Sequence, residues 1–218
     1  MKKTIIKKLF IKLSKVLGYE IIDQSDFSSP TLQKELNEDL STINEKSIIL
    51  PLGEVKITKK VNSVLIIFRT NTDVEIWDQN KKRLFEEPKI EYSLRALNSL
   101  IKSINFSKTK YPNIKFKTLI VDDKSKEKNL DRLKNLVDRS DLDIDITPLN
   151  HNKYKKKIKQ QKNEQTFSNL ASLLQSFELG KEHGEDLIFF VEDDYLHFEH
   201  MMEEMIASYE RIASQVNK

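Results

Sequence analysis

The sequence predicts an α/β fold with an open, mostly parallel sheet and flanking helices, preceded by a helical N-terminal extension. Two observations support this: apolar runs of strand length alternate four times with helical patterns, and polar residues directly follow three of these runs. Such alternation is typical of parallel sheets with right-handed crossovers. We expect a basic amphipathic helix at 1–19, an extension at 20–60 and an α/β domain at 61–218.

The elements of the α/β domain follow from hydrophobic spacing. The run at 64–68 is continuously apolar, as expected of a strand buried on both faces. The runs at 116–121 and 187–191 are also apolar, whereas 142–146 alternates apolar and acidic residues, as in a shorter strand near a sheet edge. Apolar residues at helical spacing predict helices at 90–104, 130–137, 167–177 and 198–212.

The N-terminal segment is basic and amphipathic. It carries six lysines and no acid before Glu20, and lysines interrupt every apolar run, which argues against a signal peptide. Two interpretations stay open: residues 1–17 lie on an anionic membrane surface, or the helix packs its apolar stripe on the rest of the protein. In the extension, Pro30 begins a predicted helix, and 48–50 and 55–57 are predicted to be short strands.

Composition excludes several kinds of site. The chain has no cysteine, which excludes a disulfide scaffold, a thiolate zinc site and a cysteine nucleophile. Its four glycines leave no GxGxxG motif or P-loop, and no apolar run is long enough for a transmembrane helix. With 37 basic and 34 acidic residues, the charge is too even to indicate a nucleic-acid partner. We expect a cytoplasmic protein, with contact to the inner face of the membrane as the open alternative.

Polar side chains follow three predicted strands at the point where each ends. They are, in chain order, Arg69, Thr70, Asn71, Asp122, Asp123, Glu192, Asp193 and Asp194. In open parallel sheets, ligands bind beyond the carboxyl ends of the strands. Three consecutive carboxylates after an apolar run are costly unless a cation neutralises them, and Mg²⁺ or Mn²⁺ favours carboxylate oxygens together with substrate phosphates. The sequence therefore predicts a divalent-cation site at this edge.

The two acidic strand ends resemble motifs of the nucleotide-sugar glycosyltransferases with the GT-A fold. Residues 118–125 (TLIVDDKS) resemble a strand that ends in Asp-Asp-x-Ser, and residues 189–194 (FFVEDD) resemble the metal-binding DxD motif. About 70 residues, predicted as helix, strand and helix, separate the two, which is also similar to that fold. The resemblance covers about 61–218 and implies a Rossmann-like half of a bacterial-type transferase that moves a sugar from a nucleotide-diphosphate sugar to a glycan or lipid-linked acceptor.

The resemblance also implies roles for the strand-end residues. Asp194 would be the main ligand of Mn²⁺ or Mg²⁺, with Glu192 beside it. The residues implied to bind the nucleotide are Arg69, Thr70, Asp122, Asp123 and Asp193. No residue is implied as the catalytic base.

The chain departs from the family pattern in three ways. After the first strand the family usually has Pro-Thr-x-Asn, whereas here Phe68-Arg69-Thr70-Asn71 appears, and a long insert at about 72–88, containing Trp77, follows it. The sequence also stops one helix after the acidic motif. We therefore expect an incomplete domain that binds a donor better than it transfers the sugar.

Simpler interpretations stay open for the same residues. The 192–194 acids could complement the dipole of a following helix, Asp122 and Asp123 could cap the next helix, and Arg69 could pair with one of the acids. His197 and His200 are predicted on the last helix, as surface residues or as metal ligands. The lysines of 153–162 either bind phosphates or form a solvated loop.

Three other functions remain as alternatives. The main one is a non-catalytic nucleotide-binding or membrane-surface remnant of a transferase. A nucleotidyltransferase would be expected to have a glycine- and lysine-rich loop after the first strand, and this sequence lacks one. A nucleic-acid-binding module rests only on the lysine blocks.

Overall fold

The computed structural model describes residues 10, 12–14, 16–17, 46–49, 53–73, 87–158 and 163–216. The chain divides into two compact units, Met1–Ile57 and Thr58–Lys218. In the first unit, residues 10, 12–14 and 16 are helical, and β1 (Lys46–Ile49) pairs with β2 (Gly53–Lys56) in antiparallel orientation. The helix predicted from Pro30, Trp77 in the insert, and residues 159–162 of the lysine-rich run lie outside the described residues.

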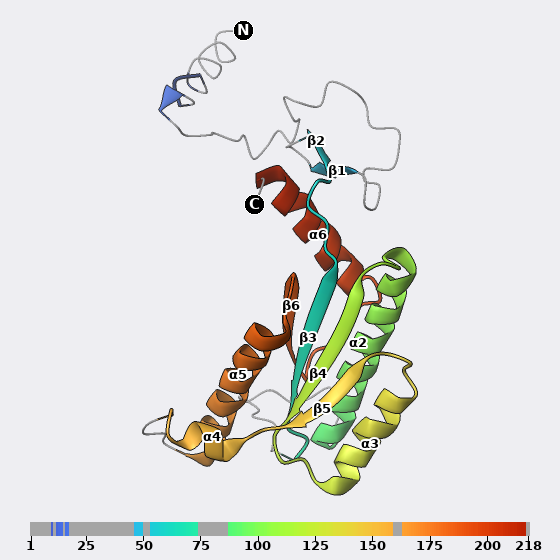
Figure 1. Cartoon of the computed structure of the whole chain (residues 1–218), viewed down its shortest axis with the longest axis vertical. Coiled ribbons are helices and arrows are strands. Elements are labelled where there is room, and N and C mark those ends of the chain that lie inside the picture. Colours follow the sequence, from blue (N-terminus) through green and yellow to red (C-terminus); the bar gives the residue numbers. More distant parts are fainter. Residues whose placement is uncertain are drawn as a thin grey trace. The chain divides into compact units, whose positions relative to one another are not determined.

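The second unit is built on a four-stranded parallel sheet (Figure 1). Its strand order is β5-β4-β3-β6, and all three neighbouring pairs are parallel. The predicted α/β class with an open parallel sheet is therefore confirmed. The strands are β3 (Ser63–Thr70), β4 (Lys115–Asp122), β5 (Ile144–Pro148) and β6 (Leu187–Glu192).

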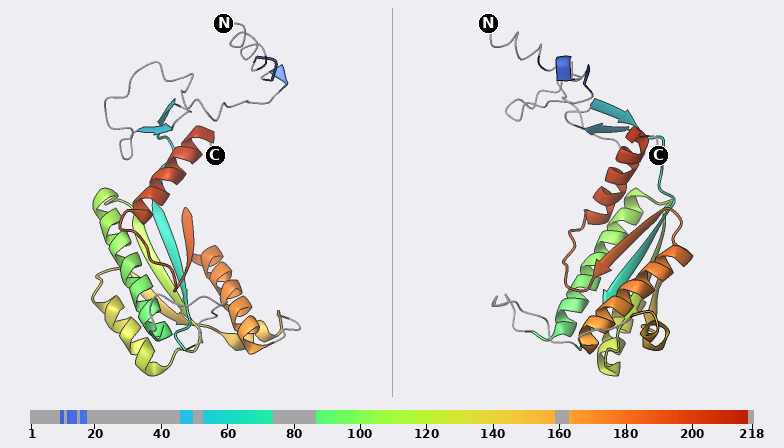
Figure 2. Two further views of the ribbon diagram at one scale, coloured as in Figure 1. Left: turned by 180° about the vertical axis from the view of Figure 1, so that it is seen from behind. Right: turned by 90° about the vertical axis from the view of Figure 1, so that its left-hand side faces the viewer.

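Five helices in the described part of this unit cover the two faces of the sheet (Figure 2). Those that follow β3, β4 and β6 pack on one face, and those that follow β5 pack on the other. The chain crosses the sheet from β3 to β5 along the first face and returns to β6 along the second, as connections of one hand require. The helices are α2 (Lys89–Lys110), α3 (Glu127–Asp138), α4 (His151–Lys155), α5 (Glu164–His183) and α6 (Met201–Val216).

Strand β3 lies in the middle of the core. Ile66 and Phe68 pack against α2, α3 and α6, whereas Leu65 and Ile67 pack against α4 and α5. All four side chains are nearly inaccessible to solvent, with relative exposures between 0 and 3%. The continuous apolar run at 64–68 therefore has the cause predicted from sequence: both faces of this strand are covered.

Three further elements bear on the sequence predictions. Strand β5 lies at a sheet edge, as predicted, and β6 forms the opposite edge with Ile188 and Phe190 partly exposed. The prediction that the last helix begins near 198 was wrong, because α6 begins at Met201 and His197 and His200 precede it. In the described part of the chain, no helix is both long and apolar enough to cross a membrane.

Candidate functional site

The carboxyl ends of β3, β4 and β6 meet at one edge of the sheet. The strand register places Thr70 opposite Asp122 and Arg69 opposite Glu192. The backbone N–H of Asp123 donates to the carbonyl of Thr70 at 2.9 Å, so β3 and β4 stay joined just past the sheet. The structure thus brings together the strand ends that the sequence singled out.

Asp193 joins β6 to β3 and to α2. Its Oδ2 atom accepts hydrogen bonds from the hydroxyls of Thr70 at 2.7 Å and Ser93 at 2.6 Å, and a longer bond of 3.4 Å from the backbone N–H of Asn71. Its Oδ1 atom lies 2.6 Å from the ammonium of Lys89. The residue is buried, at 6% exposure. These contacts tie the end of β6 to β3 and to α2.

Glu192 and Asp194, on either side of Asp193, face a different environment. Glu192 forms an ion pair with Arg69, whose guanidinium also donates to the side-chain oxygen of Asn169 at 3.1 Å. The open interpretation that Arg69 pairs with a strand-end acid is therefore confirmed. Asp194 is exposed and has no hydrogen-bond or ion-pair partner among the described residues. Because α6 begins only at Met201, these acids do not sit at its first turn, and the helix-dipole interpretation was wrong.

Asp123 is enclosed by two donors from other strand ends. The amide of Asn71 donates to its Oδ2 atom at 3.1 Å, and Nε2 of His151 lies 2.6 Å from its Oδ1 atom. Both partners of the His151 contact are nearly buried, with side-chain exposures of 12% and 7%. His151 is the first residue of α4, and its ring also contacts that of Phe167. Asp123 therefore connects the ends of β3, β4 and β5.

Asp122 supports the turn that leads into α3. Its Oδ2 atom accepts the backbone N–H of Ser125 at 3.1 Å, and its Oδ1 atom is buried without a hydrogen-bond partner in the described part of the chain. Burial raises the pKa of this carboxyl, against the opposing effect of the Ser125 hydrogen bonds. The residue that caps α3 is Lys126, without a side-chain bond, so neither Asp122 nor Asp123 is the helix cap.

The two histidines near the acidic end do not join it. The backbone N–H of His197 donates to the Ser99 hydroxyl, and its ring packs edge-on against Phe189. Burial lowers the pKa of His197. Nδ1 of His200 lies 3.3 Å from a carboxylate oxygen of Glu203. Within the described residues, no group of three or more histidine and acidic side chains is arranged to hold a metal ion by itself.

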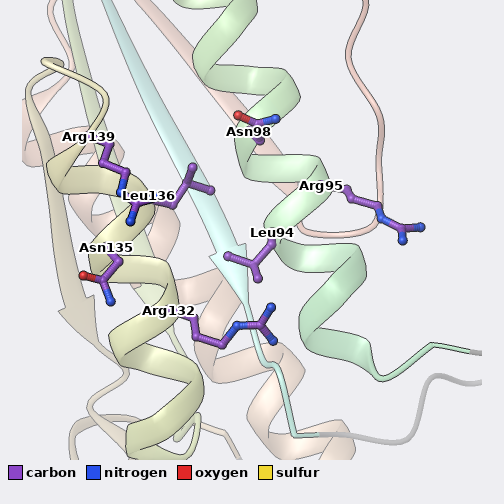
Figure 3. Close-up of a pocket in the computed structure, with 7 residues that line it drawn as sticks. All are labelled: Leu94, Arg95, Asn98, Arg132, Asn135, Leu136 and Arg139. Atoms are coloured by element: carbon purple, nitrogen blue, oxygen red, sulfur yellow. The ribbon is translucent and has the colours of Figure 1, made fainter.

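Two cavities lie beside α2 and α3. One, of about 380 Å³, adjoins the end of β3 and is lined by Thr72, Asp73, Lys89, Lys128 and Arg132, among others. The other, of about 450 Å³, lies between the two helices, where Leu94 and Leu136 point toward each other (Figure 3). Arg95 points away from α3 in that view. Of these two cavities in the described part of the chain, the first adjoins the end of β3.

Three residues of this site were not predicted from the sequence: Lys89, Ser93 and His151. Asn71 was placed at the end of the first strand but given no role. His151 follows β5 in the chain, so the rule that singled out the other strand ends would also have found it. Lys89 and Ser93 lie four residues apart in the first turns of α2, after Pro88. Nothing in their spacing indicates that they face β6, because that contact depends on how helix and sheet pack.

No protein-family model matches the chain, and no curated protein matches it. Among solved structures, it is similar to a crystal structure of residues 1–349 of TarS from S. aureus, with a TM-score of 0.38 and 18% sequence identity. The similar region covers 68% of this chain and 32% of that one. The chain therefore spans about one third of the length of that structure.

Proposed function

We propose that the α/β unit is a glycosyltransferase domain that binds a nucleoside-diphosphate sugar at the joined ends of β3, β4 and β6. The observation that carries the proposal is one polar network: Asp123 binds Asn71, and Asn71 and Thr70 bind Asp193. This network joins the two acidic motifs that resemble glycosyltransferase sequences, although about 70 residues separate them in the chain. A rigid polar platform of this kind positions a charged substrate.

The cavity beside β3 is the proposed entry for the nucleoside diphosphate. Its volume of about 380 Å³ falls within the range of about 300–1,000 Å³ that is usual for small-molecule pockets. It is bordered by Lys128, which has no partner among the described residues, and by Arg132, which lies 2.8 Å from Glu91. Lysine and arginine side chains are the usual partners of phosphate oxygens.

The exposed acids of β6 fit a divalent cation held jointly with a ligand. Asp194 is exposed and unpaired within the described residues, and the Glu192 side chain is 49% exposed beside Arg69. Mg²⁺ commonly binds to one or two carboxylates and takes its remaining ligands from phosphates and water, and Mn²⁺ favours the same oxygen ligands. When bound there, Mn²⁺ or Mg²⁺ would neutralise charge on the departing diphosphate. Because Asp193 is bonded to β3 and α2, it would fix the position of its neighbour Asp194.

The acceptor side of the proposed site is apolar. Directly after the acidic residues, Tyr195, Leu196 and Phe198 are 58, 72 and 85% exposed. Three large apolar side chains in water beside a polar site mark a contact surface. They suit the apolar part of a lipid-linked acceptor better than they suit a free sugar.

A second candidate function is nucleotide binding without transfer. It is favoured by the internal bonding of the site, because both oxygens of Asp123 and both of Asp193 are already engaged by protein donors. Among the acids of 192–194, Asp194 alone has no partner within the described residues. Such a site can hold a ligand without offering a ready proton acceptor for an acceptor hydroxyl.

Calorimetry with uridine and guanosine diphosphates, with and without Mn²⁺, tests the proposed site. We expect each nucleotide to bind only with the cation. Asp194→Asn should remove the binding that Mn²⁺ adds. The matched control is Asp138→Asn, an exposed acid at the end of α3, which should bind like the parent chain. Equal binding in the presence of a chelator would overturn the cation role, and no binding of any nucleotide would overturn the function.

Turnover separates the two candidates. Nucleotide sugars are incubated with the chain, with and without lipid-linked and free glycan acceptors, and the released nucleoside diphosphate is measured. Acceptor-dependent release that Asp194→Asn removes would support transfer. Binding with no acceptor-dependent release would favour the second candidate.

A further inference from the structure

The first unit exposes an apolar stripe on its N-terminal helical residues. Phe10, Leu13, Val16 and Leu17 are 61, 58, 81 and 66% exposed. The helical geometry is supported by the backbone bond from Leu17 to Leu13 at 3.2 Å and by the Ser14 hydroxyl, which donates to the carbonyl of Phe10 at 2.9 Å. At about 100° per residue, the four apolar side chains span about 120° of the helix circumference. An exposed stripe of this width is wide enough to bury against an apolar phase.

Lysines surround this stripe in the sequence. The first 19 residues contain six lysines and no acidic residue, and Lys12 is exposed in the structure. In the sequence pattern, at about 100° per residue, lysines 3 and 7 fall on one side of the apolar arc and lysines 8, 12 and 15 on the other, whereas Lys2 falls within it. A stripe of large apolar residues bordered on both sides by lysines is the pattern of a helix that lies in a membrane interface.

We propose that residues 1–17 bind the surface of an anionic lipid bilayer, with the apolar stripe at the boundary between headgroups and acyl chains. The lysines then face the anionic headgroups, which attract basic side chains within a Debye length of the surface. An anionic bilayer is the partner that matches both features, because its headgroups match the lysines in charge and its acyl chains match the apolar stripe. An acidic protein or a nucleic acid would meet the lysines but leave four large apolar side chains in water, and neutral lipid would leave the lysines without counter-charges.

The test is sedimentation of the full chain with phosphatidylcholine vesicles that contain or lack phosphatidylglycerol, at low and high salt. We expect binding to the anionic vesicles at low salt, and weaker binding at high salt. Replacing Lys3, Lys7, Lys8 and Lys15 by glutamine should weaken binding by up to about 600-fold, at about fivefold for each lysine near the surface. Leu13→Ser with Val16→Ser should also release the chain, because it removes half of the stripe that the structure exposes.

The matched control removes the same number of charges from the α/β unit. Lys102, Lys108, Lys155 and Lys156 are exposed and have no ion-pair partner among the described residues, so their replacement by glutamine should leave vesicle binding unchanged. An equal loss in this control would overturn the assignment to residues 1–17. Equal binding to neutral vesicles would overturn the role of the lysines. Binding to RNA with no binding to either vesicle would replace the lipid with a nucleic acid and overturn the proposal.

Discussion

The hydroxyl of Thr70 donates to Oδ2 of Asp193 across 2.7 Å and so joins two residues that lie 123 positions apart in the chain. The other oxygen of the same carboxylate holds the Lys89 ammonium, and the two charged side chains are only 10% and 9% exposed. The acidic end of β6 therefore contains two kinds of carboxylate. Asp193 is a structural partner inside the protein, whereas Asp194 faces solvent.

Asp193→Ala should lower the free energy of unfolding by about 3–5 kcal/mol, because it leaves the Lys89 charge nearly buried without its partner. Urea unfolding followed by circular dichroism measures this loss. Asp194→Ala is the matched control, and we expect it to change the free energy of unfolding by less than about 0.5 kcal/mol.

A second substitution checks the cause of that loss. When Asp193→Ala is combined with Lys89→Met, the double variant should be more stable than Asp193→Ala alone, because no charge is then left unpaired. If the two losses simply add, Lys89 is not the partner that matters. Asp193 would then act mainly through Thr70 and Ser93.

His151→Ala should destabilise the chain by about 1–3 kcal/mol, because Oδ1 of buried Asp123 loses its donor at 2.6 Å. Thermal or urea unfolding measures the effect. His151→Gln keeps an N–H donor near the Nε2 position and should recover part of the lost stability. An alanine variant as stable as the parent would show that Asp123 does not need this donor.

Glu210→Gln should raise the melting temperature at neutral pH. Glu210 is 1% exposed, its Oε1 atom accepts the backbone N–H of Val61 at 2.9 Å, and burial raises the pKa of its carboxyl. A raised pKa means that the favourable contribution is present below the ordinary pKa and is lost as the pH rises through the folded-state pKa. Glutamine keeps the acceptor without the buried charge.

The pH dependence of this gain distinguishes burial from other causes. The difference between Glu210→Gln and the parent chain should shrink toward pH 4, where the carboxyl is protonated. Glu204→Gln, which changes an exposed acid on the same helix, should have no such pH-dependent gain. A gain that is equal at all pH values would contradict the assignment to the buried charge.

Glu178 joins α4 to α5, and its effect on stability should change with pH in the direction opposite to that of Glu210. Hydrogen bonds from Lys153, then Lys157 and Tyr154, lower the pKa of Glu178 to about 2. A lowered pKa stabilises the fold above the ordinary value of about 4.5, and this contribution is lost as the pH falls toward 2. Glu178→Gln should therefore lower the melting temperature at neutral pH and match the parent near pH 2.

The size of this loss should be modest, because the Glu178 side chain is 35% exposed and solvent screens the pairs. Melting curves recorded at low and high salt measure it, and high salt should reduce it further. Glu182→Gln, on the exposed side of the same helix, is the control. A constant difference down to pH 2 would show that the side chain contributes by packing rather than by charge.

Much of the α/β unit could be predicted from sequence because its pattern is local. The run at 64–68 is apolar at every position because α2 and α6 cover one face of β3 and α5 covers the other. The alternation at 142–146 reflects the edge position of β5 in the same way. The run at 187–191 looked equally apolar, yet β6 lies at the other edge, with Phe190 partly exposed and packed against Phe177.

From the sequence, the site could be predicted only as a group of strand ends that lie at one edge of the sheet. The common edge followed from the parallel topology, but the partners of each acid did not, because they depend on helix packing. Lys89 and Ser93 reach Asp193 across about 100 residues of sequence, and no local pattern carries that information. Likewise, the resemblance implied that Asp123 binds the nucleotide. That prediction stays untested, and His151 and Asn71 hold the oxygens of Asp123 in this structure.

The central position of β3 has a consequence for synthesis of the protein. One edge of β3 pairs with β4, the next strand of the sheet in the chain. Its other edge can pair only after β6 is made, and Glu192 at the end of β6 lies 123 positions after Arg69. At about 5–20 residues per second, the ribosome needs roughly 6–25 s to make that distance. During this interval, one of the most apolar strands in the chain has an unpaired backbone edge. A ribosome-bound chain that ends before Leu187 should therefore bind chaperones strongly, and one long enough to release β6 should not.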